Sequence, residues 1–319
     1  MASTLTLQNV VDFARANTRL IPIVGVGGLG QEPALSICND TLQEVLSSPY
    51  AWRFNRASIP PFTTFNYQQD YYVTGATVSF VSPTNNGTSG GIFPIQLAPT
   101  GITVSGTTAT LNTTAQHNIA NGASVTIAGC VDPNFNHTFT VTAVPSNSSI
   151  QFTVPAGLSG SGAPGITNIG WLERCVLQDY ANTSPVKPLH NIEVVATLML
   201  ESIIQPPFKI AYEGEQQPGV IIFRTWPVPS SQIWNVFIDY QVKPPIKTSI
   251  SQNWAPWPDE FGFVLRQGFL AKALVFAEDP RAQAEMQKWQ MVIGKMLDIK
   301  DQEMRSESFF PERPVLYGG

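Results

Sequence analysis

The distribution of charge along the chain sets the strongest limit on its fold. Residues 83–165 contain a single charged side chain, Asp132, and consist mainly of Gly, Ser, Thr, Asn, Pro and β-branched residues. Short strand-like runs recur between turn signals, at residues 92–97, 101–104, 124–127, 138–144 and 150–154. A Gly/Ser-rich stretch from Gly157 to Gly165 ends the segment. We therefore expect a small all-β, sandwich-like domain inserted into the rest of the chain.

Two helices are expected before this segment. Apolar residues fall at the i, i+3, i+4, i+7 spacing of a helix at Leu7, Val10, Val11 and Ala14. A second helix is predicted over residues 40–48, with Asp40 as its N-cap and Gln43 completing a capping box. Pro49 should end that helix.

Strands and then helices are expected after the insert. Residues 234–242 alternate between apolar and polar side chains, as in a half-buried strand, and the runs 191–204, 208–212 and 219–226 also resemble strands. Residues 259–278 are apolar nearly all round, which predicts a buried helix. Asp279 and Pro280 fit the start of a last helix over 279–305, whose apolar stripe comprises Met286, Trp289, Ile293 and Met296.

These elements predict an α+β fold. The terminal helices should pack as a bundle beside a central antiparallel β-sheet, with the small all-β domain inserted into it. We expect residues 1–82 and 166–305 to form a discontinuous core and 83–165 to form the insert. The tail, 306–319, has no periodicity but carries apolar side chains suited to docking on a partner, namely Phe309, Phe310, Val315, Leu316 and Tyr317.

Composition argues against several classes of function. Charged residues make up 13% of the chain, about half the usual share, and the net charge of −5 disfavours a primary nucleic-acid binder. No run of apolar residues is as long as a membrane span, and no secretion signal is recognisable. We therefore expect synthesis and assembly in the cytoplasm. The three cysteines, Cys38, Cys130 and Cys175, lack disulfide or metal spacing and are expected to be ordinary buried thiols.

Candidate chemistry is sparse. Gly25–Gly30 spells the glycine pattern of a dinucleotide-binding turn, but the βαβ context is missing, so a linker is the better interpretation. The aromatic cluster of Trp254, Trp257, Phe261 and Phe263 could stack on sugars, although core packing is favoured. Glu213 and Glu215 fit a hairpin tip better than a pair of catalytic carboxylates. We expect no enzymatic activity, no metal and no cofactor.

Several segments resemble a known family. Residues 39–46 (NDTLQEVL) followed by 49–55 (PYAWRFN), the exit at 240–245 running into Pro258–Phe261, and Asp279-Pro280-Arg281 resemble tail tubular protein A, the podovirus-type head-to-tail adaptor or gatekeeper. Gly268, Ala271 and Ala273 belong to the same pattern, and the likeness covers 1–82 and 166–305. The insert resembles a small β-domain found in virion proteins, through residues 117–122, 125–127, 135–136 and 139–141.

The resemblance implies a structural protein of a tailed bacteriophage. It implies a ring of about twelve copies in the virion neck, with the portal on one side, the nozzle or tail tube on the other, and a channel through which DNA passes without sequence-specific binding. On this basis we hypothesise that the terminal helices and the tail at 306–319 contact the portal. The alternative is a receptor-binding or carbohydrate-binding tail protein that uses the insert. That segment contains no Trp or Tyr, which disfavours sugar stacking.

Overall fold

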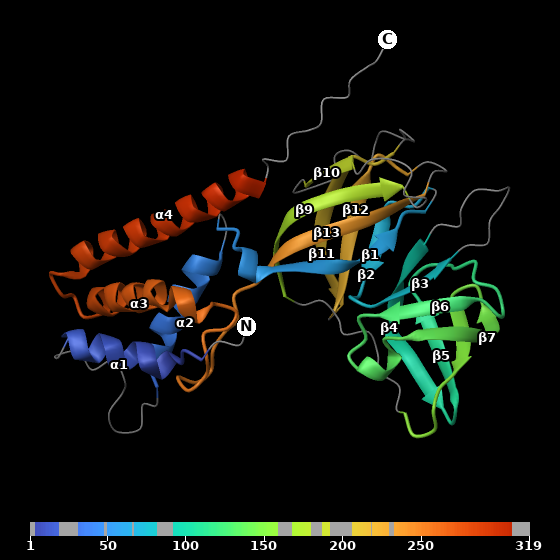
Figure 1. Ribbon diagram of the computed structural model, residues 1–319, viewed down its shortest axis with the longest axis horizontal. Helices are drawn as coiled ribbons and strands as arrows, with labels where there is room; N and C mark the ends of the chain where they lie inside the picture. The colour runs from blue at the N-terminus through green and yellow to red at the C-terminus, as the bar shows by residue number, and fades with distance from the viewer. Residues whose placement is uncertain are drawn as a thin grey trace, which may run out of the picture. The chain divides into compact units, whose positions relative to one another are not determined.

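The chain forms two compact units (Figure 1). The computed structural model describes residues 4–18, 31–47, 50–65, 67–81, 92–158, 168–179, 187–191, 206–217, 219–229 and 233–307. Met1–Asn55 and Pro244–Gly319 make up the first unit, which we call the helical unit. Arg56–Lys243 make up the second, which we call the strand unit. Each unit is described separately.

The helical unit is built around a central helix. Its described elements are α1 (Leu7–Thr18), α2 (Ala34–Leu46), η1 (Arg53–Asn55), η4 (Asp259–Phe261), α3 (Gly262–Phe276) and α4 (Ala282–Glu307). Helix α3 packs against α1, α2 and α4. The stripe predicted for α1 is confirmed, since all four of its apolar side chains are buried. The stripe predicted for α4 is likewise confirmed, with Trp289, Ile293 and Met296 buried and Met286 packed against the same core. None of the described helices is long and apolar enough to cross a membrane.

The predicted start of the second helix is wrong. Helix α2 begins at Ala34, and Asp40 is an exposed residue inside the helix rather than its N-cap. The helix starts behind Pro33, whose carbonyl accepts a hydrogen bond from Ile37 N at 3.1 Å. Ile37 and Cys38 are buried and extend the apolar face toward the N-terminus, so packing overrides the capping signal at Asp40.

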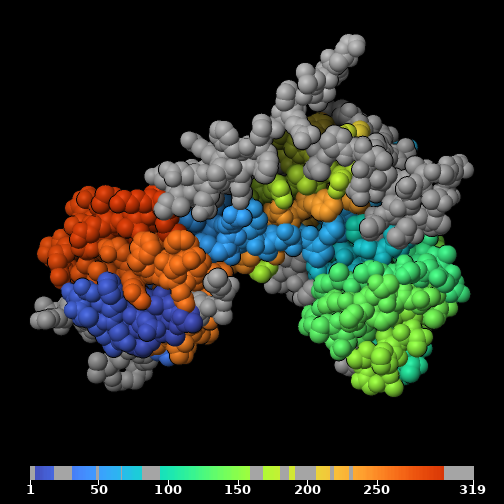
Figure 2. Space-filling view, viewed as in Figure 1, coloured from blue at the N-terminus to red at the C-terminus, as the bar shows by residue number. Residues whose placement is uncertain are grey.

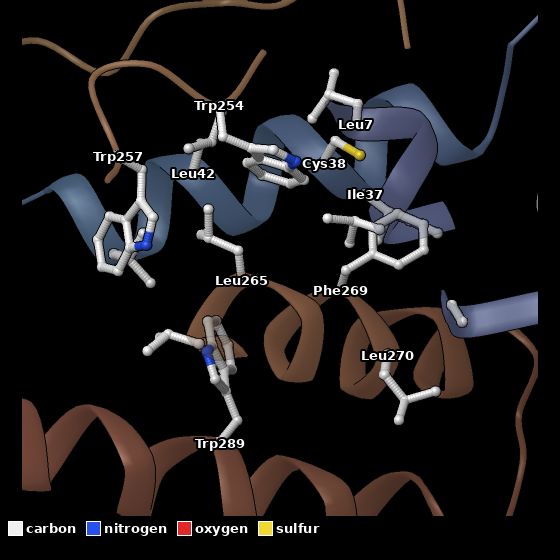
Figure 3. Packing of buried hydrophobic residues seen from close by; sticks show 14 of the residues in the cluster. Leu7, Ile37, Cys38, Leu42, Trp254, Trp257, Leu265, Phe269, Leu270 and Trp289 are labelled. Atoms are coloured by element: carbon white, nitrogen blue, oxygen red, sulfur yellow. The ribbon is translucent and has the colours of Figure 1, made fainter. Parts of the chain in front are cut away.

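Large aromatic side chains fill the core of the helical unit (Figure 3). Leu265 and Phe269 of α3 point toward α2, and Trp289 of α4 points toward α3. Gly268 makes the approach between α3 and α4 possible, because a Cβ there would lie 2.5 Å from Cε2 of the Trp289 ring. The two helices can therefore pack this closely only with glycine at position 268.

A seven-stranded sheet forms one part of the strand unit. Its order is β1-β13-β9-β10-β11-β12-β2, and only β10 and β11 pair in parallel. The strands are β1 (Arg56–Thr63), β2 (Asp70–Val73), β9 (Ile169–Asp179), β10 (Lys187–Asn191), β11 (Lys209–Gln217), β12 (Val220–Trp226) and β13 (Trp234–Val242). Phe62 on β1 lies 5.2 Å from Tyr71 on β2, ring centre to ring centre, although these strands stand at opposite ends of the order. The sheet is therefore strongly curled.

The second part of the strand unit is a closed six-stranded barrel. The order around it is β3-β4-β5-β8-β7-β6, and β3 also pairs with β6. The strands are β3 (Thr77–Val81), β4 (Ile92–Ser105), β5 (Thr108–Thr113), β6 (Ser124–Ala128), β7 (Thr138–Ser146) and β8 (Ser149–Thr153), with a short helix η2 (Pro133–Phe135). Strand β4 turns the corner of the barrel with a register shift between Leu97 and Ile102, where Gly101 has a φ of 55°.

The structure corrects the predicted fold class. An α+β fold organised by a terminal-helix bundle is wrong, because strands predominate and form two curled sheets, accompanied by only four helices among the described residues. The expected sandwich is a closed barrel, since its first strand finds partners on both edges. Closure leaves this small sheet without exposed edges, which a two-layer sandwich would retain. The division into an adaptor core, an insert and a docking tail stays a prediction.

Candidate interaction surface

A histidine and two carboxylates with possible acid–base chemistry lie in the strand unit. His117 is buried in the barrel, where burial lowers its pKa, and its Nδ1 accepts a hydrogen bond from Ile119 N at 3.2 Å. Glu213 and Glu215 are exposed on β11, and the Glu215 carboxylate accepts a hydrogen bond from Gly219 N in the hairpin that joins β11 to β12. Within the ranges that the structure describes, no group of three His, Cys, Asp or Glu side chains is placed to hold a metal ion.

The prediction of ordinary buried thiols is confirmed for all three cysteines. Burial raises the pKa of Cys130 to about 11 and that of Cys175 to about 12, with smaller contributions from Asp132 and Asp239 respectively. Burial also raises the pKa of Cys38 strongly. Each side chain therefore stays a neutral thiol at physiological pH.

Three of the four residues in the aromatic cluster pack in the core, as the favoured interpretation predicted. Trp254 and Trp257 are fully buried, and their indole N–H groups donate to the carbonyl oxygens of Thr6 and Phe261 at 3.1 and 2.9 Å. Trp257 also meets Trp52 edge to face, with ring centres 5.6 Å apart. The fourth, Phe263, is 52% exposed. Helix α3 is therefore not buried all round, which corrects the prediction for 259–278.

Phe263 lies on a groove between three helices of the helical unit. The groove is lined by Phe13 of α1, by Phe263, Arg266 and Gln267 of α3, and by Lys288, Met291, Val292 and Lys295 of α4. The residues from α3 and α4 recur at i, i+3, i+4 or i+7, so each helix contributes one face. Met291 is 60% exposed. Figure 2 shows α1, α3 and α4 together on the face of this unit that carries blue, orange and red.

Three of the residues that line the groove, Arg266, Lys288 and Lys295, are cationic. Lys288 Nζ is 2.6 Å from Glu285 Oε1, and this pairing, with a hydrogen bond from Gln267, lowers the pKa of Glu285. Among the residues that the structure describes, Arg266 and Lys295 have no carboxylate partner. The groove therefore combines four apolar side chains, Phe13, Phe263, Met291 and Val292, with two cations that have no carboxylate partner within the described part of the chain.

A second exposed apolar feature lies at the other end of α3. Val275 is 53% exposed and Phe276 60% exposed, and Ala277 and Glu278 beside them are exposed as well. We call residues 275–278 the α3 tip. Glu278 has a φ of 54°, and its N–H donates to Val275 O while Asp279 N donates to Leu274 O. This is the paired hydrogen-bond pattern of a Schellman cap.

Sequence patterns provide little indication of these two surfaces. Apolarity all round α3 predicts burial, and only the packing of neighbouring helices determines which side chains remain uncovered. The weak signal was Met291, an apolar residue outside the predicted stripe of α4. The predicted docking residues Phe309, Phe310, Val315, Leu316 and Tyr317 lie outside the described residues, as does Gly25–Gly30.

Comparison with protein families identifies a relationship to phage adaptors. The family model of the SU10 adaptor protein, a family of phage head-to-tail adaptors, matches residues 135–311, just over half of the chain. The matched region runs from the barrel through β9–β13 and includes α3 and α4, and with them the α3 tip and all of the groove except Phe13. No curated protein matches the chain.

Proposed function

The chain belongs to the SU10 adaptor protein family, and from this premise we propose that it forms a ring of about twelve copies that joins the phage portal to the tail and leaves a channel for DNA. The observation that carries the proposal is the family match over 135–311. Membership makes the chain a structural adaptor of the virion neck, associated with other structural proteins of the phage. Ring number, channel and individual partners belong to the proposal.

In this proposal the partners are the portal on one side and the nozzle or tail tube on the other. The tail at 306–319 docks on the portal through Phe309, Phe310, Val315, Leu316 and Tyr317. The podovirus gatekeeper type, assembly in the bacterial cytoplasm and the absence of enzymatic activity are parts of the same proposal. A neck ring needs no catalytic activity, because its function is to hold two assemblies together around a channel.

The barrel surface favours an adaptor over a carbohydrate-binding tail protein. Phe135 and Phe152 are fully buried in the barrel, and Phe139 is half-buried with its ring centre 4.4 Å from that of Phe152. These aromatic side chains fill the interior instead of forming an exposed platform on which a sugar ring could stack.

Location in the particle tests the proposal directly. A gold-labelled antibody against this chain should mark the neck, between the capsid vertex and the tail, when native particles are viewed by electron microscopy. Label at the tail tip or along fibres would contradict the adaptor function and favour receptor binding.

Portal docking needs a separate experiment. A variant lacking 306–319 should remain folded and lose co-purification with the portal protein, because the apolar anchors are gone. The matched control replaces Glu312 and Arg313 by Ser and keeps the anchors, and it should still co-purify. Unchanged portal binding by the deletion variant would refute the docking role of the tail.

A further inference from the structure

We propose that the groove of one copy receives the α3 tip of the neighbouring copy, so that one helix supplies both halves of the side-to-side contact in the ring. The groove comprises Phe13, Phe263, Arg266, Gln267, Lys288, Met291, Val292 and Lys295, and the tip is 275–278. This inference rests on the proposed ring and adds the surfaces by which neighbouring copies recognise each other.

The two surfaces match in apolar character. Phe263 and Met291 expose more than half of their surface in the groove, and Val275 and Phe276 do the same at the tip. Large apolar side chains that gather at one place on a surface mark interaction sites. An aromatic side chain seated in a pocket is also the usual anchor of a protein interface. Phe276 would be that anchor here.

The two surfaces also match in charge. Helix α3 has no basic residue in its last turn, so the negative end of its dipole is uncompensated, and Glu278 adds a carboxylate beside it. The remaining charges in the next turn, Asp279 and Arg281, pair with each other at 2.8 Å. The groove presents Arg266 and Lys295. A negative tip therefore faces a positive groove, as complementary interfaces require.

The tip of a chain cannot occupy the groove of the same chain. Phe263 and Phe276 stand at opposite ends of one uninterrupted helix, about 20 Å apart at 1.5 Å per residue. An α3 tip that occupies the groove must therefore come from another copy. Because the two surfaces differ, the contact is heterologous, and a repeated heterologous contact closes into a ring when the rotation permits.

The backbone at Glu278 supports a role for its carboxylate. A φ of 54° lies in the left-handed region, where glycine is the residue of lowest cost. The cap hydrogen bonds, at 3.1 and 3.0 Å, hold the backbone at Glu278 in this conformation. A charged residue at a position that favours glycine indicates that the charge itself is used.

Charge exchange provides the test. Sedimentation velocity of the purified full chain over a concentration series should show self-association of the native protein. Arg266→Glu and Glu278→Arg should each weaken that association by at least about tenfold, because each places like charges across the contact. The double variant, R266E with E278R, should restore it, since every interface then pairs the exchanged charges. Asp40→Arg, an equal charge change on an exposed residue of α2, is the control and should associate normally.

Phe276→Ser provides a second measurement that does not depend on charge. Because Phe276 is exposed, thermal unfolding should be unchanged while association is lost.

A native chain that stays monomeric at every concentration, single variants that associate normally, or a double variant that fails to recover would each overturn the inference. If Arg266→Glu instead abolished binding of DNA to the purified chain and left self-association intact, the groove would be a nucleic-acid site. The inference would then fail as well. The antibody label at the neck is independent, so the adaptor function can stand when this contact fails.

Discussion

The barrel and the helical unit treat their apolar side chains in opposite ways. In the barrel Val131 and Val144 are the only large apolar side chains among the described residues that are exposed. The helical unit exposes Ile246, Phe263, Val275, Phe276 and Met291. The barrel therefore buries most of its own large apolar side chains, whereas the helical unit leaves several of its own exposed, as interaction surfaces do.

Geometry accounts for this difference. In a closed barrel every strand sends alternate side chains into one interior, and no edge remains. Helix α3 is apolar on more than one face. Its neighbours bury Val264, Leu265 and Leu274 but leave Phe263, Val275 and Phe276 exposed. The closed sheet therefore covers its apolar side chains by itself, whereas the helices do not cover all of theirs.

The largest expected effect tests whether the two regions are stabilised independently. Phe152→Ala in the barrel and Phe269→Ala in α3 each remove a fully buried ring, and each should lower the free energy of unfolding by about 3–5 kcal/mol. Hydrogen exchange followed by mass spectrometry should show loss of protection confined to the barrel in the first variant and to the helical unit in the second. Loss of protection throughout the chain in either variant would mean that the two regions unfold as one.

A smaller effect tests the closure of the barrel. A Cβ at Gly129 would lie 2.3 Å from the carbonyl oxygen of Gly75, and Gly129 has a φ of 83°. Gly129→Ala should therefore cost about 3 kcal/mol, from overpacking against rigid backbone together with the left-handed conformation. Gly106→Ala is the matched control, because its φ is 62° and nothing lies within 4 Å of the added carbon. Equal costs in thermal melts of the two variants would show that the close approach is unimportant.

The corresponding test in the helical unit uses the contact between α3 and α4. Gly268→Ala would press a methyl group against the Trp289 ring and should destabilise the protein by about 2 kcal/mol, despite the better helix propensity of alanine. Gly294→Ala lies in α4 with open space around the added carbon and should stabilise by up to about 1 kcal/mol. Denaturant unfolding curves should move in opposite directions, and a shared direction would contradict the packing described here.

The smallest effect concerns the α3 tip. Glu278→Gly should raise the free energy of unfolding by up to about 1 kcal/mol, because glycine adopts a positive φ without the steric cost that glutamate bears. The same variant should associate more weakly in sedimentation. If the variant is more stable and associates as well as the native protein, the charge of Glu278 plays no part in the contact.

Local patterns predicted the elements whose partners lie on one face. The stripe of α1 and the alternation over 234–242 both gave the correct element, since one-sided burial leaves a periodic trace in the sequence. Strand β5 was missed because Thr108–Thr113 contains only two apolar residues, Ala109 and Leu111, between polar ones. The alternating burial of its side chains arises only because β4 and β8 pair with it on either side.

Non-local features escaped prediction for a related reason. Closure of the barrel depends on pairing Val78 with Ile127, residues far apart in the chain, and nothing in either segment specifies that partner. The groove escaped for the same reason, because the exposure of Phe263 depends on how α1, α3 and α4 pack. The resemblance of scattered motifs correctly predicted a phage adaptor. The docking tail stays a prediction.

The three buried cysteines amount to a built-in set of reporters. Cys38 belongs to the core of the helical unit, Cys175 to that of the curled sheet and Cys130 to that of the barrel. A buried neutral thiol reacts with an alkylating reagent only when its surroundings open, so its modification rate measures the free energy of that opening. One time course on the unaltered protein would therefore rank the three cores by their opening equilibria. Repeated on assembled necks, it would reveal which core assembly protects.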